Sequence, residues 1–512
     1  ADVNGPSVVI DPRRSLPTRR EWQGRPWEET VIYELHIGTF TPEGTFRAAI
    51  DKLPYLADLG ITQLEVMPVS QFGGARGWGY DGVLLYAPHS AYGTPDDFHA
   101  FIDAAHALGL SVVLDIVLNH FGPEGNYLPL LSPAFFHQDR MTPWGNGIAY
   151  DVDAVRQYIA EAPLFWLSEY HLDGLRFDAI DQIHDDAETH ILPEIAQRIR
   201  DAFPDRHIHL TTEDSRNVIF LHPRDEHGQT PLFTAEWNDD FHNVAHVFAT
   251  GESHGYYQDF AFEPEKKLAR ALAEGFVYQG EISLQTGKSR GVEGREQPPQ
   301  FFVDFIQNHD QVGNRAQGER LISLAGAEKT RVLFAALLLS PHIPLLFMGE
   351  EYGETHPFLF FTDFHGDLAK AVREGRAKEF SGHAGHDETV PDPNDLNTFM
   401  RSKLDWNKAE TEEGRAWLHV TRELIALRQR NIVPLLKQRG AVEGHVLQTA
   451  LGMVAVSWRF PSGTLSLALN IGKKPLTLPD LSGKTIFSWP EAVENLPPNS
   501  IVVRFADGDA AL

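Results

Sequence analysis

Eight short apolar runs, rich in β-branched residues, constrain the fold of this chain more than any other feature. They occupy residues 31–40, 61–69, 111–120, 172–180, 207–214, 231–240, 301–310 and 343–351. Helical spacing of apolar residues separates most of them, at residues 46–59, 95–108, 155–170, 188–203 and 319–339. Parallel strands need a crossover between them, and a helix usually supplies it. The alternation therefore predicts an α/β fold, a (β/α)8 TIM barrel.

The pattern changes on both sides of this region. Residues 1–29 are rich in Pro, Arg and acidic side chains and show no period, so we expect an N-terminal extension or linker there. The barrel is predicted over residues 30–431, with a short insertion near residues 121–153 and a last helix at residues 412–430. Short alternating runs follow at residues 441–450, 453–460, 464–470, 484–488 and 500–505. They predict a C-terminal antiparallel β domain, sandwich-like, over residues 432–512.

Composition excludes several classes of partner. The net charge is -27, from 44 Lys and Arg against 71 Asp and Glu, which argues against DNA, RNA or an anionic membrane and favours an uncharged ligand. There is no cysteine, so disulfides and thiolate metal sites are impossible, and a reducing compartment fits. No apolar run reaches 18 residues, and the polar start is no signal peptide. We therefore expect a cytoplasmic protein.

The fourth apolar run ends in an arginine and an aspartate two positions apart. In a strand, the side chains of Arg176 and Asp178 point to the same side. A neighbouring guanidinium favours the ionised carboxylate, which is what a carboxylate nucleophile requires. A salt bridge at a strand end explains this stretch alone equally well.

Three other runs also end in polar residues. The third ends in Asn119-His120, the fifth in Glu213-Asp214, and the seventh in Asn308-His309-Asp310. The chemistry of a TIM barrel sits at the C-terminal ends of its strands, where the strands deliver these groups into one central space. Four such ends predict a catalytic centre built mainly from carboxylates.

These strand ends carry a family resemblance. Asp115-Ile-Val-Leu-Asn119-His120, Gly174-Leu-Arg176-Phe-Asp178, Glu213-Asp214 and Asn308-His309-Asp310 resemble, in order, the four motif regions of the α-amylase superfamily of glycoside hydrolases. The resemblance covers the predicted barrel from residue 31 to about residue 430. It implies that Asp178 is the nucleophile, Glu213 the general acid/base and Asp310 the transition-state stabiliser. Glu213 must then keep its proton near neutral pH, which requires a pocket that raises its pKa.

Three further stretches narrow the resemblance to one branch of this superfamily. Residues 72–82, 236–242 and 357–364 are similar to the branch that frees trehalose from maltooligosyltrehalose, although the first stretch is shared with branching and debranching relatives. The implied reaction is retaining cleavage of the α-1,4-glucosidic bond next to the terminal trehalose. The alternatives are a branching, debranching or α-amylase activity on α-glucan, and a non-catalytic glucan-binding homologue. Members of this branch usually carry an N-terminal β-sandwich, of which at most a last strand near residues 7–11 is expected here.

The resemblance also implies substrate-binding residues. Arg176 would hold the nucleophile, His120 and His309 would bind sugar hydroxyls, and Tyr80 would stack under the sugar being cleaved. Trp237, Asp239 and Phe361 would recognise the trehalose end. The alternatives are a structural role for each histidine and simple packing for Trp237 and Phe361.

Other polar residues near the strand ends are assigned differently. Asp115 lies deeper in its strand and is expected to orient the site, while Glu350 and Glu351 stay unassigned. The chemistry requires no cofactor and no metal. Asn119 stands where some relatives help to hold calcium, but residues 121–153 lack a dense set of carboxylate ligands.

Overall fold

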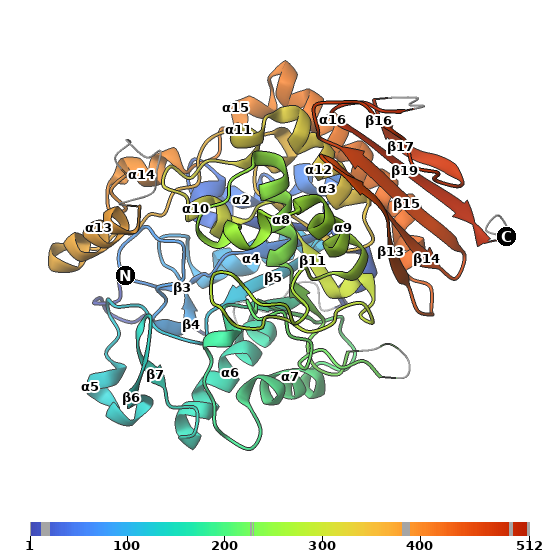
Figure 1. Cartoon of the computed structure of the whole chain (residues 1–512). Coiled ribbons are helices and arrows are strands. Elements are labelled where there is room, and N and C mark those ends of the chain that lie inside the picture. Colours follow the sequence, from blue (N-terminus) through green and yellow to red (C-terminus); the bar gives the residue numbers. More distant parts are fainter. Residues whose placement is uncertain are drawn as a thin grey trace.

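The centre of the molecule is a closed barrel of parallel strands (Figure 1). The structure, a computed structural model, describes residues 2–11, 21–225, 228, 230–380, 390–490 and 495–508. The barrel strands follow one another in chain order: β1 (Ile32–Leu35), β2 (Gln63–Val66), β5 (Ser111–Ile116), β8 (Gly174–Phe177), β9 (His209–Thr212), β10 (Ala235–Trp237), β11 (Phe302–Asp304) and β12 (Ile343–Phe347). Each lies inside one of the eight predicted runs, so the predicted TIM barrel is confirmed.

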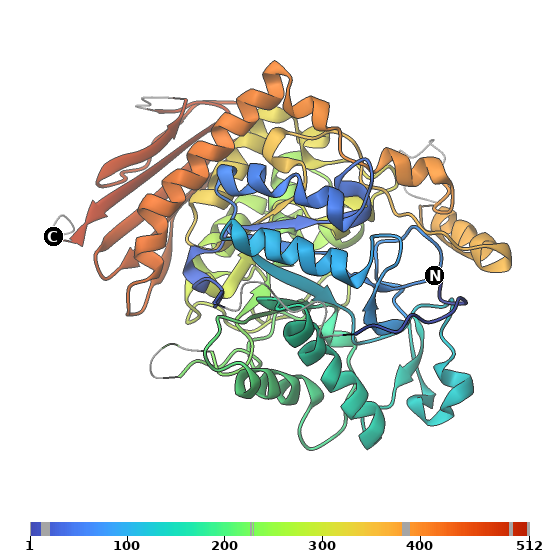
Figure 2. The ribbon, with the colours of Figure 1, turned by 180° about the vertical axis from the view of Figure 1, so that it is seen from behind.

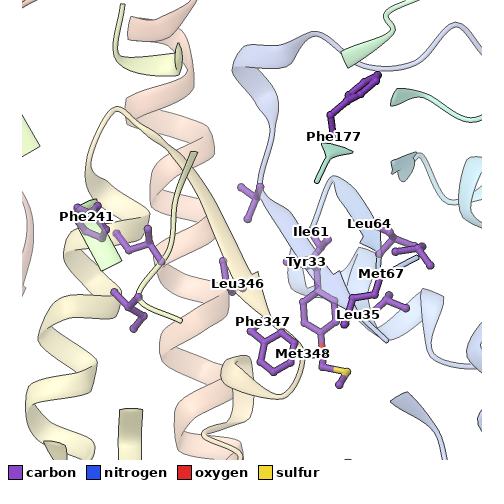
Figure 3. Close-up of a cluster of buried hydrophobic side chains, with 14 of the residues drawn as sticks. Tyr33, Leu35, Ile61, Leu64, Met67, Phe177, Phe241, Leu346, Phe347 and Met348 are labelled. Carbon is purple, nitrogen blue, oxygen red and sulfur yellow. The ribbon is translucent and has the colours of Figure 1, made fainter. Parts of the chain in front are cut away.

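Side chains alternate between the two faces of each barrel strand, as strand geometry requires. Ile32, Val303 and Leu345 pack together with Trp237 in a small buried cluster inside the barrel. Their outward neighbours belong to the large core between strands and helices, where Tyr33, Leu64 and Leu346 lie in one cluster (Figure 3). The apolar runs are therefore continuous because both faces of these strands are buried.

Helices lie around the barrel and, in the case of α13, project away from it (Figure 1): α1 (Ile37–Phe40), α2 (Phe46–Ile50), α3 (Leu53–Leu59), α4 (Pro95–Ala107), α6 (Asp153–Glu169), α7 (Ile191–Ala202), α8 (Asp239–Thr250), α9 (Pro264–Glu274), α10 (His309–Gly313), α11 (Leu321–Ala325), α12 (Ala327–Leu339), α13 (Gly366–Phe380), α14 (Leu396–Arg401), α15 (Trp406–Ala409), α16 (Glu412–Leu427) and α17 (Val433–Leu436). Two predicted helices are each divided. Gly326, with φ of 85°, separates α11 from α12. Pro54 stands in the first turn of α3, where its missing N–H costs nothing, so α2 and α3 are distinct.

A five-stranded antiparallel sheet lies to one side of the barrel (Figures 1 and 2). Its spatial order is β13 (Glu443–Ala450), β14 (Met453–Phe460), β15 (Gly463–Asn470), β19 (Ser500–Asp507) and β17 (Lys484–Trp489). The sheet packs against α9 and α12, and the Trp458 indole donates to the Leu272 carbonyl at 2.9 Å. The predicted C-terminal antiparallel strands are confirmed, whereas the proposed domain boundaries stay predictions.

The predicted insertion after β5 contains a short helix, α5 (Leu128–Leu131), and a hairpin of β6 (Phe136–Thr142) and β7 (Gly145–Ile148). The N-terminal residues reach this insertion, because a Cβ on Gly125 would meet Val3. Residues 7–11 form no strand. No helix in the described part of the chain is long and apolar enough to cross a membrane.

Candidate active site

The predicted catalytic residues stand at or just beyond the C-terminal ends of the barrel strands. Asp178 follows β8 directly, and Glu213 follows β9 in the same way. A short loop after β11 leads to α10, which begins at His309, and the Asn308 side chain caps this helix. Asp310 is the second residue of α10. The barrel therefore brings its chemistry to one end, as strand geometry predicts.

Arg176 connects the carboxylates. Its Nη1 donates to Asp115 Oδ2 at 2.8 Å and to Asp178 Oδ1 at 2.9 Å, and its Nη2 lies 2.7 Å from Glu213 Oε2. The guanidinium lies over the Trp237 ring, 4.1 Å from the ring centre, and the Arg176 side chain is 1% exposed. One buried cation thus holds the predicted nucleophile and the predicted acid at its two ends.

The backbone after β8 is fixed around these groups. Ala179 has φ of 40°, in the left-handed region that a residue with a side chain rarely adopts. Its N–H donates to Glu213 Oε2 at 2.9 Å, and the Asn119 side chain donates to the Ala179 carbonyl at 3.2 Å. The unusual turn positions Asp178 and Glu213 relative to each other. Strained backbone of this kind is typical of functional sites.

Burial dominates the electrostatics of the three predicted catalytic carboxyl groups. It raises the pKa of Asp178, Glu213 and Asp310, and the nearby cations Arg176 and His309 oppose it. For Glu213 this direction is the one that a proton donor requires. For Asp178 it differs from the expectation that Arg176 keeps the pKa low. The reason is that the Arg176 guanidinium is shared among the carboxyl groups of Asp115, Asp178 and Glu213, each of which is withdrawn from water.

Tyr80 and His309 form the other side of the cluster. The Tyr80 hydroxyl donates to Asp115 Oδ2 at 2.6 Å and lies 2.7 Å from His309 Nε2. On its far side, His309 Nδ1 lies 2.5 Å from Glu34 Oε1, and its backbone N–H donates to Glu34 Oε2 at 3.0 Å. Glu34 was missed from the sequence. The available signal was a carboxylate inside the otherwise apolar first strand.

Asp239 lies beside the predicted catalytic carboxyl groups. Burial raises its pKa to about 8, and the negative charges of Glu213 and Asp310 add to this effect. Its Oδ1 accepts a hydrogen bond from the Gln311 side chain at 3.2 Å. The side chain predicted to recognise the substrate therefore stands within electrostatic reach of the predicted acid and the predicted stabiliser.

His120 reaches the cluster from beyond β5. Its Nε2 lies 2.9 Å from the Tyr80 carbonyl oxygen, and its Nδ1 pairs with Asn119 Oδ1. Its ring stacks on Trp144 from the β6–β7 hairpin, with 4.3 Å between ring centres and 9° between planes. Trp144 is 46% exposed and, with His120 and Phe136, lines a cavity of about 660 Å³. The sequence did not single out Trp144.

Trp237 and Phe361 are buried. Trp237 is 2% exposed and packs inside the barrel under Arg176, and Phe361 is fully buried against the rings of His36, Phe358 and Phe399. The structure gives both rings packing partners, and a direct contact with substrate stays a prediction for them.

The two unassigned glutamates are also buried. Glu351 accepts hydrogen bonds from the hydroxyls of Tyr33 and Tyr55, each at 3.1 Å, and Glu350 Oε2 accepts from the Phe347 N–H at 3.0 Å. Both therefore have structural partners at the end of β12. Among the described residues, no group of three or more His, Asp or Glu side chains is arranged to hold a metal ion.

Comparison with known proteins agrees with this geometry. The family model of the alpha amylase catalytic domain matches residues 17–129 and 136–431. Malto-oligosyltrehalose trehalohydrolases of Deinococcus radiodurans and of Rhizobium sp. are 42% and 41% identical to the chain. The alignments cover 93% and 98% of this chain, and 80% and 85% of those proteins. The chain belongs to the malto-oligosyltrehalose trehalohydrolase family. The resemblance to α-amylase relatives seen in the motifs is thereby confirmed.

Solved structures place this trehalohydrolase family member among similar barrels. A Salmonella typhimurium protein, provisionally named an alpha amylase, is 73% identical with a TM-score of 0.97, and the match covers 99% of this chain and 86% of that one. A pullulanase from Anoxybacillus sp., complexed with maltotetraose, has a TM-score of 0.68 at 18% identity, with coverage of 99% and 75%. The second likeness shows the shared fold alone.

Proposed function

We propose that this chain is a retaining glycoside hydrolase that cleaves the α-1,4-glucosidic bond next to the terminal trehalose of malto-oligosyltrehalose and releases trehalose. The observation that carries the retaining mechanism is the buried Arg176, which binds Asp178 through one terminal nitrogen and Glu213 through the other. Retaining glycosidases need two carboxyl groups close together, about 5 to 5.5 Å apart. Binding to one guanidinium favours such a short separation.

The proposed chemistry has two displacements. Asp178 attacks the anomeric carbon while Glu213 donates its proton to the departing glycosidic oxygen, so trehalose leaves and a covalent glycosyl-enzyme remains. Glu213, now ionised, takes a proton from water, which attacks the same carbon and frees Asp178. The raised pKa of Glu213 suits the first step. Burial raises the pKa of Asp178, and the positive charge of Arg176 is the strongest influence that lowers it. Ionisation of Asp178 therefore depends on Arg176.

The remaining predicted residues would bind the sugar. Asp310, with His309 before it, would hold the hydroxyls of the ring that becomes oxocarbenium-like, and these contacts strengthen in the transition state. Tyr80 and His120 lie against each other at the rim of the same cluster, because His120 Nε2 reaches the Tyr80 carbonyl. Their contact supports the proposal that both bind the same sugar ring.

Product analysis on maltotriosyltrehalose tests this proposal. We expect trehalose and maltotriose in equal amounts, and much slower release of small sugars from maltopentaose, which has the same number of glucose units without the trehalose end. Release of glucose or maltose alone from the capped substrate, without trehalose, would refute the proposal. New α-1,6 linkages, loss of branches or internal cuts in unmodified starch would instead identify branching, debranching or α-amylase activity on α-glucan.

The non-catalytic alternative makes its own prediction. A glucan-binding homologue would turn over no α-glucan, and Asp178→Ala would leave its glucan binding unchanged. The proposal also includes a cytoplasmic location, which the absence of cysteine favours. Fractionation of the source cells would test this location.

A further inference from the structure

Glu34 touches no group that reacts, yet both of its carboxylate oxygens are used by one residue of the site. Oε1 pairs with the His309 ring and Oε2 with the His309 backbone N–H. The Glu34 side chain is 2% exposed and the His309 side chain 3%, so water does not compete for these contacts. A carboxylate held this way fixes both the start of α10 and the orientation of the imidazole.

The hydrogen-bond directions determine how many protons the His309 ring carries. Nδ1 faces a carboxylate oxygen, which accepts, so Nδ1 donates. Nε2 faces the Tyr80 hydroxyl, whose single hydrogen points to Asp115 Oδ2 at 2.6 Å. The Tyr80 oxygen can therefore only accept from Nε2. Both ring nitrogens donate, and such a ring is a positively charged imidazolium.

We propose that Glu34 is a positioning residue of the active site, which holds the His309 ring in place and doubly protonated, so that a second buried cation besides Arg176 serves the catalytic carboxyl groups. The proposal rests on the proposed function, because it gives Glu34 its role through residues assigned to bond cleavage. It also explains why a charged side chain is kept on the inner face of β1, where burial of an unpaired carboxylate is costly.

The charges around His309 agree with this role. Burial lowers the pKa of His309, but Glu34 and then Asp310 raise it to about 9, while Arg176 opposes them. In turn His309 lowers the pKa of Asp178, Glu213 and Asp310 against their burial. His309 also lowers the pKa of the buried side chains of His36, Glu65 and Asp115. Loss of the imidazolium charge should therefore raise the pKa of both the nucleophile and the acid.

Glu34→Gln tests the proposal, because the amide keeps the shape and removes the charge. Its oxygen can still accept from the backbone, while its NH2 would donate to Nδ1 and leave His309 neutral. We expect both limbs of the pH profile of kcat/KM to move up by about one pH unit, the order expected for one nearby charge. We also expect kcat/KM near neutral pH to fall about tenfold to a hundredfold, the lower range for a misplaced catalytic contact. Glu34→Asp keeps the charge on a shorter side chain, so its kcat/KM and pH profile should lie between those of the wild type and Glu34→Gln.

Glu65→Gln is the matched control. Glu65 stands opposite Glu34 in register on β2 and is 1% exposed. Neither of its carboxylate oxygens has a hydrogen-bond partner in the part of the chain that the structure describes. Burial raises its pKa well above the ordinary value and so favours the neutral carboxyl group, whose shape and charge the amide of glutamine keeps. We expect its pH profile to match that of the wild type.

A second measurement does not depend on activity. In protein labelled with 15N-histidine, His309→Asn identifies the His309 signals by their loss. We expect both ring nitrogens of His309 to be protonated at pH 7 in the wild type and to titrate near pH 9, and only one to be protonated at pH 7 in Glu34→Gln. A neutral His309 in the wild type, or a doubly protonated one in Glu34→Gln, would overturn the proposal. Failure of the wild type to release trehalose, with the 15N result as expected, would instead refute only the proposed function.

Discussion

Replacing Arg176 by lysine should impair catalysis severely although the positive charge is kept. The guanidinium makes three charge-assisted contacts, to Asp115, Asp178 and Glu213, from two nitrogens that point in fixed directions. A lysine ammonium is a single point on a flexible stem and cannot occupy both positions. The variant would therefore leave at least Asp178 or Glu213 without its partner.

The size of the effect follows from the hydrogen bonds that lysine cannot make. A hydrogen bond to a charged group contributes about 1.5 to 3 kcal/mol, so removing two of the three costs about 3 to 6 kcal/mol. If the whole cost falls on the transition state, kcat/KM decreases by about 10² to 10⁴-fold, since each factor of ten corresponds to about 1.4 kcal/mol. Without the planar guanidinium over the Trp237 ring, stability decreases as well.

Steady-state release of trehalose from maltotriosyltrehalose measures kcat/KM, and thermal unfolding measures stability. Arg320→Lys is the control, because Arg320 is also fully buried, donates to the Met348 and His356 carbonyls at 2.8 Å each and lies over the Phe347 ring. We expect it to lower the melting temperature and to leave kcat/KM of the folded protein unchanged. Near-normal turnover in Arg176→Lys would refute the catalytic role and leave a structural salt bridge.

Further predictions concern the carboxyl groups. Asp178→Asn should reduce kcat/KM by about 10⁴-fold or more without lowering the melting temperature, because it removes the nucleophile and a buried charge together; residual activity above a hundredth would contradict this. Glu213→Gln should lose about 10² to 10⁴-fold on maltotriosyltrehalose but far less on α-glucosyl fluoride, whose leaving group needs no proton, and equal losses would argue against an acid role. Wild-type kcat/KM should fall at acid pH as Asp178 gains a proton and at alkaline pH as Glu213 loses one, so a flat profile is incompatible with this pair. Asp239 has its pKa raised from 3.8 to about 8 in the folded protein, which therefore loses stability as pH rises between these values. The melting temperature of Asp239→Asn should accordingly rise relative to that of the wild type as pH increases over that interval. A constant difference between the two melting temperatures from pH 4 to 8 would refute this prediction.

The barrel, and the gathering of polar side chains at one of its ends, were predictable because they depend on local pattern. A parallel strand must be followed by a crossover, so the alternation of apolar runs and helical spacing leaves few folds open. Because such strands end together, polar residues at their ends, such as Asp178 and Glu213, are predicted to meet without any knowledge of distance. Breaks within helices, as at Gly326, were less accessible, since glycine permits the positive φ seen there but does not require it.

Tertiary structure decided which of the predicted site side chains are buried and how charge is shared among them. Trp237 and Phe361 stand in motifs that suggested contact with sugar, but the strands and loops around them bury both rings. Arg176 was paired with Asp178 by its spacing in the strand, whereas closure of the barrel also brings it Asp115 and Glu213. Sequence determined this protein's fold and which residues make up its predicted catalytic centre, because periodicity and strand ends are local. Only the closed barrel set the protonation of that centre, because pKa values depend on burial and on charges from distant strands.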